Sequence, residues 1–234
     1  MFKIIVILFL LIIVFYCVNN KIHIKFKTFL RRGFAPKRGK FGVYCYCGKQ
    51  GQGKTYSVVE FLLKHTDKKI YANLKSLKGV DYTAISGIDG LLALRKEHDC
   101  IIFFDEIFTI LSKKNSSRLS KEEVNQVLDF LSQMRKRQII FITTAQEWLE
   151  IDMTLRRYCR YQINCRMFNF FGLGILIKQF NDAENMKWSI DDNEYVAPLI
   201  ETTISKCNLY IAKSYDTYAV SYTHLRAHET SLHL

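Results

Sequence analysis

The fold of this chain depends on the stretch Tyr44-Cys45-Tyr46-Cys47-Gly48-Lys49-Gln50-Gly51-Gln52-Gly53-Lys54-Thr55. Its last eight residues match G-x-x-x-x-G-K-[ST], the phosphate-binding P-loop, at every position. Residues 41–47 are apolar and β-prone, and residues 55–63 have the apolar periodicity of a helix. Strand, glycine-rich turn and helix is the order that the motif requires. A glycine-rich turn that matched by chance would not supply this context.

The residue types of the loop suit a phosphate ligand. Glycines let the backbone adopt conformations closed to residues with a Cβ and approach phosphates closely. Backbone N–H groups of the loop and of the helix N-terminus then point at the anion. We expect Lys54 to reach the β- and γ-phosphates of ATP and the Thr55 hydroxyl to bind Mg²⁺. The predicted nucleotide-contacting residues are Gly48, Lys49, Gln50, Gly51, Gln52, Gly53, Lys54, Thr55 and Tyr56.

A second motif follows about fifty residues later. Residues 100–104 are apolar, and Asp105 and Glu106 come directly after them. A strand buried on both faces is continuously hydrophobic, and ligands of open α/β sheets bind at the carboxyl ends of such strands. This is the Walker B pattern, in which Asp105 holds the Mg²⁺ shell and Glu106 orients the attacking water. An ordinary strand that happens to end in acids is the alternative interpretation.

The remaining elements of residues 41–164 predict an α/β P-loop NTPase core, with a mostly parallel sheet flanked by helices. Strands are expected at 69–73, 138–144 and 158–164. Helices are expected at 88–97 and from a capping box at Ser120 and Glu123 to about Lys136, with a short helix or turn at 151–157. Residues 111–119 are polar and predict a loop. Thr143, Thr144 and Gln146 end the strand at 138–144, which places polar groups beside the expected γ-phosphate.

Residues 165–219 show a different pattern, with strands expected at 168–178, 186–190 and 208–215. We interpret them as an antiparallel β extension of the sheet. Residues 220–234 resemble a translated sequencing adapter and are excluded from the fold as a probable non-native tail.

The amino-terminal segment indicates a membrane anchor. Residues 2–18 are almost wholly apolar and close to the minimum length of a transmembrane helix. A cleaved signal peptide is the alternative, but no A-x-A-like site follows the run. The connector at residues 19–40 is basic and suits anionic inner-leaflet lipid near Lys21–Lys40, or else a solvated linker. The positive-inside rule then places the ATPase domain in the cytoplasm, at the inner or plasma membrane.

Charge and cysteine content agree with this organisation. The net charge is +12, yet residues 1–40 alone carry nine basic and no acidic groups. The excess charge therefore favours a membrane surface over nucleic acid, although DNA remains a possible partner. Seven scattered cysteines indicate free thiols in a reducing compartment. Cys45 and Cys47 have the wrong spacing for C-x-x-C chemistry, and we expect the two thiols not to meet.

Residues 41–219 resemble the ATPase domain of the zonula occludens toxin (Zot) family, within the FtsK–HerA class of P-loop motors. That family includes the assembly and export ATPases of filamentous phages. The generic part of the resemblance is the P-loop with Asp105-Glu106. The more specific part is Asn73, residues 133–146, the segment Ile151-Asp152-Met153-Thr154-Leu155-Arg156, and Tyr215-Asp216-Thr217. One departure is that the phage enzymes carry their membrane span after the ATPase domain.

The resemblance implies a homo-oligomer, such as a ring, in which an arginine touches the neighbouring subunit's γ-phosphate. Arg156 and Arg157 are the candidates, with Arg135 and Arg137 behind them, and an arginine in a surface ion pair is the alternative for each. Gln146 is implied as the polar sensor. The predicted catalytic residues are therefore Glu106, Lys54, Gln146 and Arg156.

The sequence thus predicts a membrane-anchored ATPase that uses Mg-ATP hydrolysis to drive phage or mobile-element virion assembly, export or genome packaging. Phage coat or assembly proteins, or DNA, are the expected partners. A DNA translocase and a non-catalytic nucleotide-binding scaffold remain as alternatives. A small-molecule kinase would need an arginine-rich lid, which this sequence lacks. A secreted toxin does not suit the predicted topology.

Overall fold

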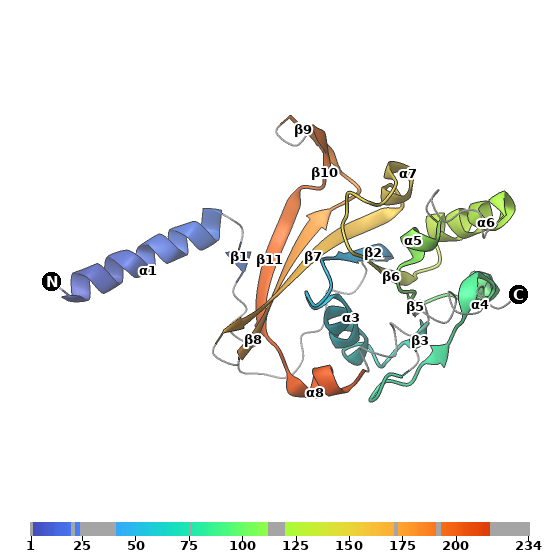
Figure 1. Cartoon of the computed structure of the whole chain (residues 1–234), viewed down its shortest axis with the longest axis horizontal. Helices are drawn as coiled ribbons and strands as arrows, with labels where there is room; N and C mark the ends of the chain where they lie inside the picture. Colours follow the sequence, from blue (N-terminus) through green and yellow to red (C-terminus); the bar gives the residue numbers. More distant parts are fainter. Residues whose placement is uncertain are drawn as a thin grey trace, which may run out of the picture.

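A nine-stranded sheet forms the centre of the molecule, with the strand order β1-β11-β8-β7-β2-β6-β5-β3-β4 (Figure 1). The computed structural model of the chain describes residues 2–19, 22–23, 41–74, 76–111, 120–170, 173–190 and 193–215. Two short strands, β9 (Lys187–Ser189) and β10 (Glu194–Val196), make a separate antiparallel hairpin.

Six neighbouring strands of the sheet are parallel, which confirms the predicted α/β fold. They are β2 (Gly42–Cys47), β3 (Lys69–Ala72), β4 (Thr83–Ala84), β5 (Cys100–Phe103), β6 (Ile140–Ala145) and β7 (Cys159–Phe170). Every residue of β2, β5 and β6 is buried. Strands covered on both faces need apolar residues at every position, which explains the continuous apolar runs in the sequence.

Helices cover both faces of the sheet. On one face α3 (Lys54–Leu63) and α8 (Leu209–Lys213) pack over Tyr44 and Tyr46 of β2. The other face is covered by α4 (Gly87–Ala93), η1 (Leu94–Lys96), α5 (Ile107–Leu111), α6 (Lys121–Ser132) and the short α7 (Met153–Arg156). The predicted helices at 55–63, 88–97 and 151–157 are confirmed, whereas α5 was not predicted.

The capping box at the start of α6 is confirmed. The Ser120 hydroxyl accepts a hydrogen bond from the Glu123 backbone N–H at 3.1 Å, and the Ser120 N–H donates to the Glu123 carboxylate at 2.7 Å. Two of the N–H groups that a helix end leaves unpaired are therefore satisfied. The helix ends at Ser132, earlier than predicted, and residues 133–138 continue as turns.

The outer strands form the expected antiparallel extension. β8 (Leu173–Asp182) pairs with β7, β11 (Leu199–Lys206) pairs with β8, and β1 (Ile22–His23) adds in parallel to β11. The predicted boundary after residue 164 falls inside β7, which is continuous from Cys159 to Phe170.

One strand of this extension was not predicted, and one predicted strand is a helix. β11 was not predicted, because its threonines and charged residues conceal a strand that is only partly buried. The strand predicted at 208–215 is instead α8, because the Asn208 side chain accepts a hydrogen bond from the Tyr210 N–H and caps a helix.

The amino-terminal segment forms α1 (Phe2–Asn19), which projects from the sheet (Figure 1) and exposes large apolar side chains at residues 6–9 and 11–16. Among the residues that the structure describes, no helix has both the length and the apolar character needed to cross a membrane. Most of the predicted connector at 19–40, the loop at 112–119, Asp216, Thr217 and the tail at 220–234 lie outside the described residues.

The prediction that the Cys45 and Cys47 thiols would not meet was wrong. Their sulfur atoms lie 3.6 Å apart. Residues two apart in a strand point to the same face, and the expectation had placed them on opposite faces. Burial raises the pKa of the Cys45 thiol well above its ordinary value, and the contact with Cys45 together with burial raises the pKa of the Cys47 thiol. Both are therefore neutral packing groups.

A buried ionic cluster fastens α3 to the antiparallel strands. The Glu60 carboxylate accepts hydrogen bonds from Lys178 of β8 at 2.8 Å and from Lys64 at 2.6 Å. Glu60 and Lys178 have only 14% and 15% of their side chains exposed. Burial alone would raise the pKa of Glu60, but the two ammonium groups outweigh it and lower the pKa.

We predict that Glu60→Gln lowers the free energy of unfolding by about 2 kcal/mol at pH 7, because hydrogen bonds to a charged group are lost and two lysines stay behind. A carboxylate whose pKa is lowered by folding stabilises the protein above its unfolded pKa. That stabilisation is lost as the pH falls below the ordinary value of 4.5. The difference between wild type and variant in denaturant unfolding is therefore expected to shrink below pH 4.5. Glu150→Gln, at an exposed position, is the control, and an equal difference at all pH values would contradict the assignment.

Candidate active site

The P-loop connects the carboxyl end of β2 to α3 in a conformation that requires glycine. Gly53 has φ +81° and caps α3, and an added Cβ there would lie 2.8 Å from the Met167 side chain and 2.9 Å from that of Leu176. At Gly48 an added Cβ would lie 2.7 Å from the Cys165 carbonyl oxygen. Glycine is therefore needed at both positions, because β7 and β8 leave no room for a Cβ and because the backbone adopts a positive φ.

Lys54, the lysine of the motif, lies against the first residues of the loop. Lys54 Nζ donates to the Gly48 carbonyl at 2.5 Å and to the Lys49 carbonyl at 3.2 Å. Lys54 and Thr55 form the first turn of α3, where backbone N–H groups have no partner within the helix. A positive side chain and unpaired N–H groups converge here, which is the arrangement that binds phosphate.

The two carboxylates follow β5 and are held in place by their neighbours. The Asp105 N–H donates to the Asn73 side-chain oxygen at 2.8 Å, and the Thr144 hydroxyl donates to the Asp105 carboxylate. The Ile107 N–H donates to the Thr143 hydroxyl at 3.3 Å. Side chains from the ends of β3 and β6 therefore fix the turn that carries Asp105 and Glu106.

Glu106 adopts a strained backbone. Its φ is +51°, in the left-handed region that residues with a Cβ rarely occupy. Its carbonyl accepts the Thr109 N–H at 3.0 Å and so begins α5. Strain of this kind persists only where the surroundings enforce it, and it is concentrated at functional positions.

The carboxyl end of β6 links the two halves of the site. β6 lies between β2 and β5 in the sheet. The Gly48 N–H reaches the Ala145 carbonyl at 3.3 Å and the Gln146 carbonyl at 3.1 Å, while Thr144 binds Asp105. The P-loop and the acidic turn are therefore attached to consecutive residues of one strand.

Sequence reasoning identified some of these side chains without their roles. Thr143 and Thr144 were expected beside the γ-phosphate, yet they brace the acidic turn. Asn73 was noted only as the end of a strand, and its position opposite Asp105 follows from the β3–β5 pairing. Gln146 itself is exposed directly after β6, and its role as a sensor stays a prediction.

Three predicted nucleotide-contacting residues direct their side chains elsewhere. The Tyr56 ring is buried, and its hydroxyl accepts the Asn208 N–H at 2.6 Å, so it joins α3 to the start of α8. Gln52 turns towards β7, where it accepts the Met167 N–H. Lys49 is exposed and lies 3.9 Å from Glu147. In this structure, therefore, the Tyr56 and Gln52 side chains are engaged within the protein and the Lys49 side chain lies at the surface.

The predicted role of Arg156 at a neighbouring subunit does not fit its environment. Only 4% of the residue is exposed. Its guanidinium donates to the Leu149 carbonyl at 2.5 Å and to the Ile151 carbonyl at 2.7 Å, and it pairs with Glu194 of β10 at 3.2 Å. A side chain held in this way cannot extend across a subunit interface, so Arg156 fastens the segment after β6 to the β9–β10 hairpin.

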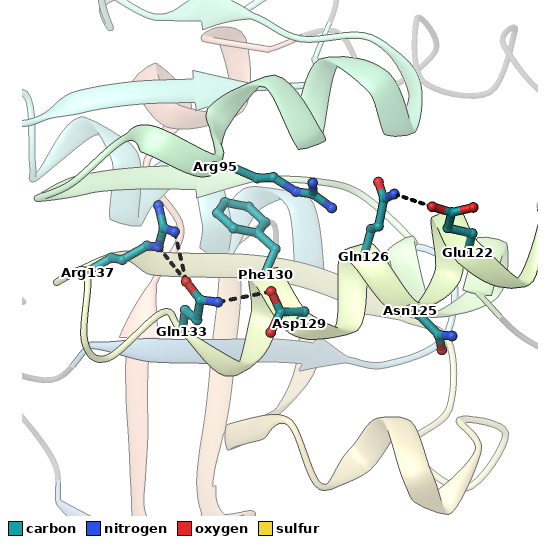
Figure 2. A pocket seen from close by; sticks show the side chains of 8 residues that line it. All are labelled: Arg95, Glu122, Asn125, Gln126, Asp129, Phe130, Gln133 and Arg137. Atoms are coloured by element: carbon teal, nitrogen blue, oxygen red, sulfur yellow. Dashed lines mark hydrogen bonds between the residues drawn. The ribbon is translucent and has the colours of Figure 1, made fainter.

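The other candidate arginines occupy two surface hollows away from the P-loop. Arg157 is exposed and, with Arg135 and Arg160, lines a hollow of about 300 Å³ beside the start of β2, at the opposite end of that strand. Arg137 lines a second hollow of about 340 Å³ between η1 and α6, where Gln133 accepts its hydrogen bonds (Figure 2). Neither hollow includes a P-loop residue, so none of these arginines completes the site of its own subunit.

The comparisons with known proteins agree with this geometry. The family model for the AAA family, ATPases associated with various cellular activities, matches residues 44–167. The chain belongs to this family. It is therefore a P-loop ATPase, and the matched region contains both the P-loop and the acidic turn.

Several solved structures are similar to the chain at low sequence identity, and the first of them has the same fold. The N-terminal domain of zonular occludens toxin from Neisseria meningitidis is 16% identical, with a TM-score of 0.50 over 76% of this chain and 100% of that domain. The flagellar accessory protein FlaH from Methanocaldococcus jannaschii is 12% identical, with a TM-score of 0.44 over 71% of this chain and 89% of that one. A KaiC-like protein from Pyrococcus horikoshii OT3 is also 12% identical, with a TM-score of 0.41 over 67% and 88%. No curated protein sequence matches the chain significantly.

We predict that Arg156→Gln destabilises the isolated chain by about 3 kcal/mol, because it removes buried hydrogen bonds and leaves Glu194 without its partner. Arg157→Gln changes an exposed residue next to it and is expected to alter stability by less than about 0.5 kcal/mol. Denaturant unfolding of both variants tests this difference. Equal stability of the two variants would contradict this structural role and make Arg156 a candidate for contact with a neighbouring subunit again.

Proposed function

We propose that the chain binds ATP at the P-loop and hydrolyses its γ-phosphate with the help of Glu106. The observation that carries this proposal is the attachment of the P-loop and the Asp105-Glu106 turn to adjacent residues of β6. The backbone of Gly51–Thr55 and Lys54 Nζ would hold the phosphates. Glu106, on its strained turn, would orient a water molecule.

The donor set also suits Mg²⁺, which prefers oxygen ligands and usually keeps several waters. Thr55 and Asp105 supply a hydroxyl and a carboxylate, and Thr144 orients the carboxylate from behind. Bound there, Mg²⁺ would neutralise charge on the β- and γ-phosphates.

Hydrolysis then follows by in-line displacement. The water oxygen forms a bond to the γ-phosphorus, and the bond from that phosphorus to the β–γ bridging oxygen breaks. Glu106 accepts a hydrogen bond from the attacking water and takes up the proton that the water loses, which then passes to solvent. The products are ADP and phosphate. Lys54 would stabilise charge on the phosphoryl oxygens, and Gln146, which is exposed, would sense the γ-phosphate.

We further propose that this ATPase works as a homo-oligomer in virion assembly, export or genome packaging by a phage or mobile element. The resemblance to the Zot family supports this role, and the likeness to the N-terminal domain of zonular occludens toxin supports the shared fold. Arg157, exposed next to buried Arg156, is the residue we favour for contact with a neighbouring subunit's γ-phosphate. Coat or assembly proteins, or DNA, are the proposed cargo.

Membrane attachment through α1 completes the proposal, with the ATPase domain on the cytoplasmic side. The helix of 18 residues would be about 27 Å long, slightly shorter than a hydrocarbon core of roughly 30 Å. Its exposed apolar side chains would be covered by lipid. The basic residues at Lys21–Lys40 would then face anionic headgroups.

We predict that Glu106→Gln slows Mg-ATP hydrolysis by the full chain at least about 100-fold, because the water loses its orienting carboxylate, while nucleotide binding persists. Lys54→Ala is expected to weaken binding itself. Phosphate release and nucleotide titration, each with and without single- and double-stranded DNA, check both effects. Hydrolysis by Glu106→Gln at the wild-type rate would remove Glu106 from the mechanism. Acceleration of wild-type hydrolysis by DNA would favour a DNA translocase. Nucleotide binding without hydrolysis by the wild type would favour a scaffold.

We predict that Ile12→Asp shifts the full chain from the membrane fraction towards the soluble fraction. A carboxylate near the middle of an inserted helix costs about 2.5 to 3.5 kcal/mol. Ile190→Asp is the matched control, since Ile190 is equally apolar and 87% exposed but lies beside β9. Flotation with liposomes measures both variants, and equal flotation would speak against insertion of α1.

A further inference from the structure

The P-loop is held from the side by the β7–β8 pair, at several points along its length. β2 ends at Cys47, opposite Asn164, whereas β7 continues to Phe170. β8 pairs with one side of this part of β7, and the other side, which faces β2 earlier in the strand, runs alongside the P-loop. The Cys165 carbonyl lies against Gly48, and the side chains of Met167 and Leu176 lie against Gly53.

Gln52 provides the one side-chain hydrogen bond that joins the described P-loop to this overhang. Its Oε1 accepts the Met167 N–H at 3.0 Å, and its own N–H closes a turn with the Lys49 carbonyl at 3.2 Å. Beyond Asn164 no strand among the described residues pairs with that side of β7, so the Met167 N–H needs another acceptor. Gln52 thus satisfies a backbone group of β7 and is itself fixed at two points.

The Gln52–Met167 hydrogen bond lies next to the turn that leads into α3. Gln52 directly precedes Gly53, whose left-handed conformation turns the chain into α3 and directs the following N–H groups of Lys54 and Thr55. Holding residue 52 fixes the start of that turn. A loop ordered before the ligand arrives binds more tightly, because less conformational entropy is lost on binding.

We propose that Gln52 is a positioning residue of the P-loop, which acts through Met167 of β7 and does not contact phosphate. This inference rests on the proposed function, since it concerns binding of ATP at that loop. It assigns the carboxyl-terminal β extension a part in nucleotide affinity, because β7 and β8 supply the surface against which the loop is ordered.

The test compares Gln52→Met with wild type in the full chain. Methionine has a similar length but no strong acceptor, so the Met167 N–H loses its partner. The Kd for Mg-ADP and the KM for Mg-ATP are expected to rise roughly three- to tenfold, the range that one hydrogen bond accounts for. The kcat is expected to change less than twofold. Gln126→Met is the matched control, because it also removes a side-chain hydrogen bond, on α6.

Two further measurements separate positioning from the alternatives. Gln52→Glu retains an acceptor for the Met167 N–H, so positioning predicts that it binds Mg-ADP more tightly than Gln52→Met does. If the Gln52 side chain instead contacted phosphate, Gln52→Glu would bind Mg-ADP more weakly than Gln52→Met, because the carboxylate would repel phosphate. That result would overturn the proposal. Unchanged affinity of Gln52→Met would overturn it too, as would a melting temperature without nucleotide that falls well below that of Gln126→Met. Failure of the wild type to bind any nucleotide would contradict the proposed function instead.

Discussion

The hydrogen bonds at the carboxyl end of β6 are the constraint on which the site depends. Thr144 holds the Asp105 carboxylate, and the next two carbonyls receive the Gly48 N–H. β2 and β5 are not neighbours in the sheet, so their ends would have no fixed separation without the strand between them. The site is built from groups that are far apart in sequence, and the parallel register of three buried strands sets their relation.

The antiparallel strands contribute more than an extension of the sheet. β7 pairs with β2 and then overhangs it, which places β7 and β8 against the P-loop and against the first turns of α3. The Glu60–Lys178 ion pair fixes the same helix further along. The nucleotide loop is therefore enclosed on one side by β6 and on the other by the β7–β8 pair. This explains why the predicted boundary after residue 164 divides a region that is structurally continuous.

The sequence was sufficient to predict features with a local cause. The P-loop, the capping box and the buried parallel strands each follow from residue types at short spacing. Features that depend on distant partners were not predictable in this way. Arg156 is buried because Glu194 and two carbonyls surround it, and nothing in its local segment indicates burial. The Cys45–Cys47 contact could have been predicted, since residues two apart in a strand share a face.

The pairing of β2 also has a consequence for how the chain is made. Its partners are residues 140–145 and 159–164, so the P-loop strand remains without neighbours until most of the chain has left the ribosome. α1, by contrast, comes before all of these strands in the chain. The apolar helix therefore emerges while the ATPase core is still unable to fold. The topology of the sheet thus separates in time the emergence of the apolar helix from the folding of the ATPase core.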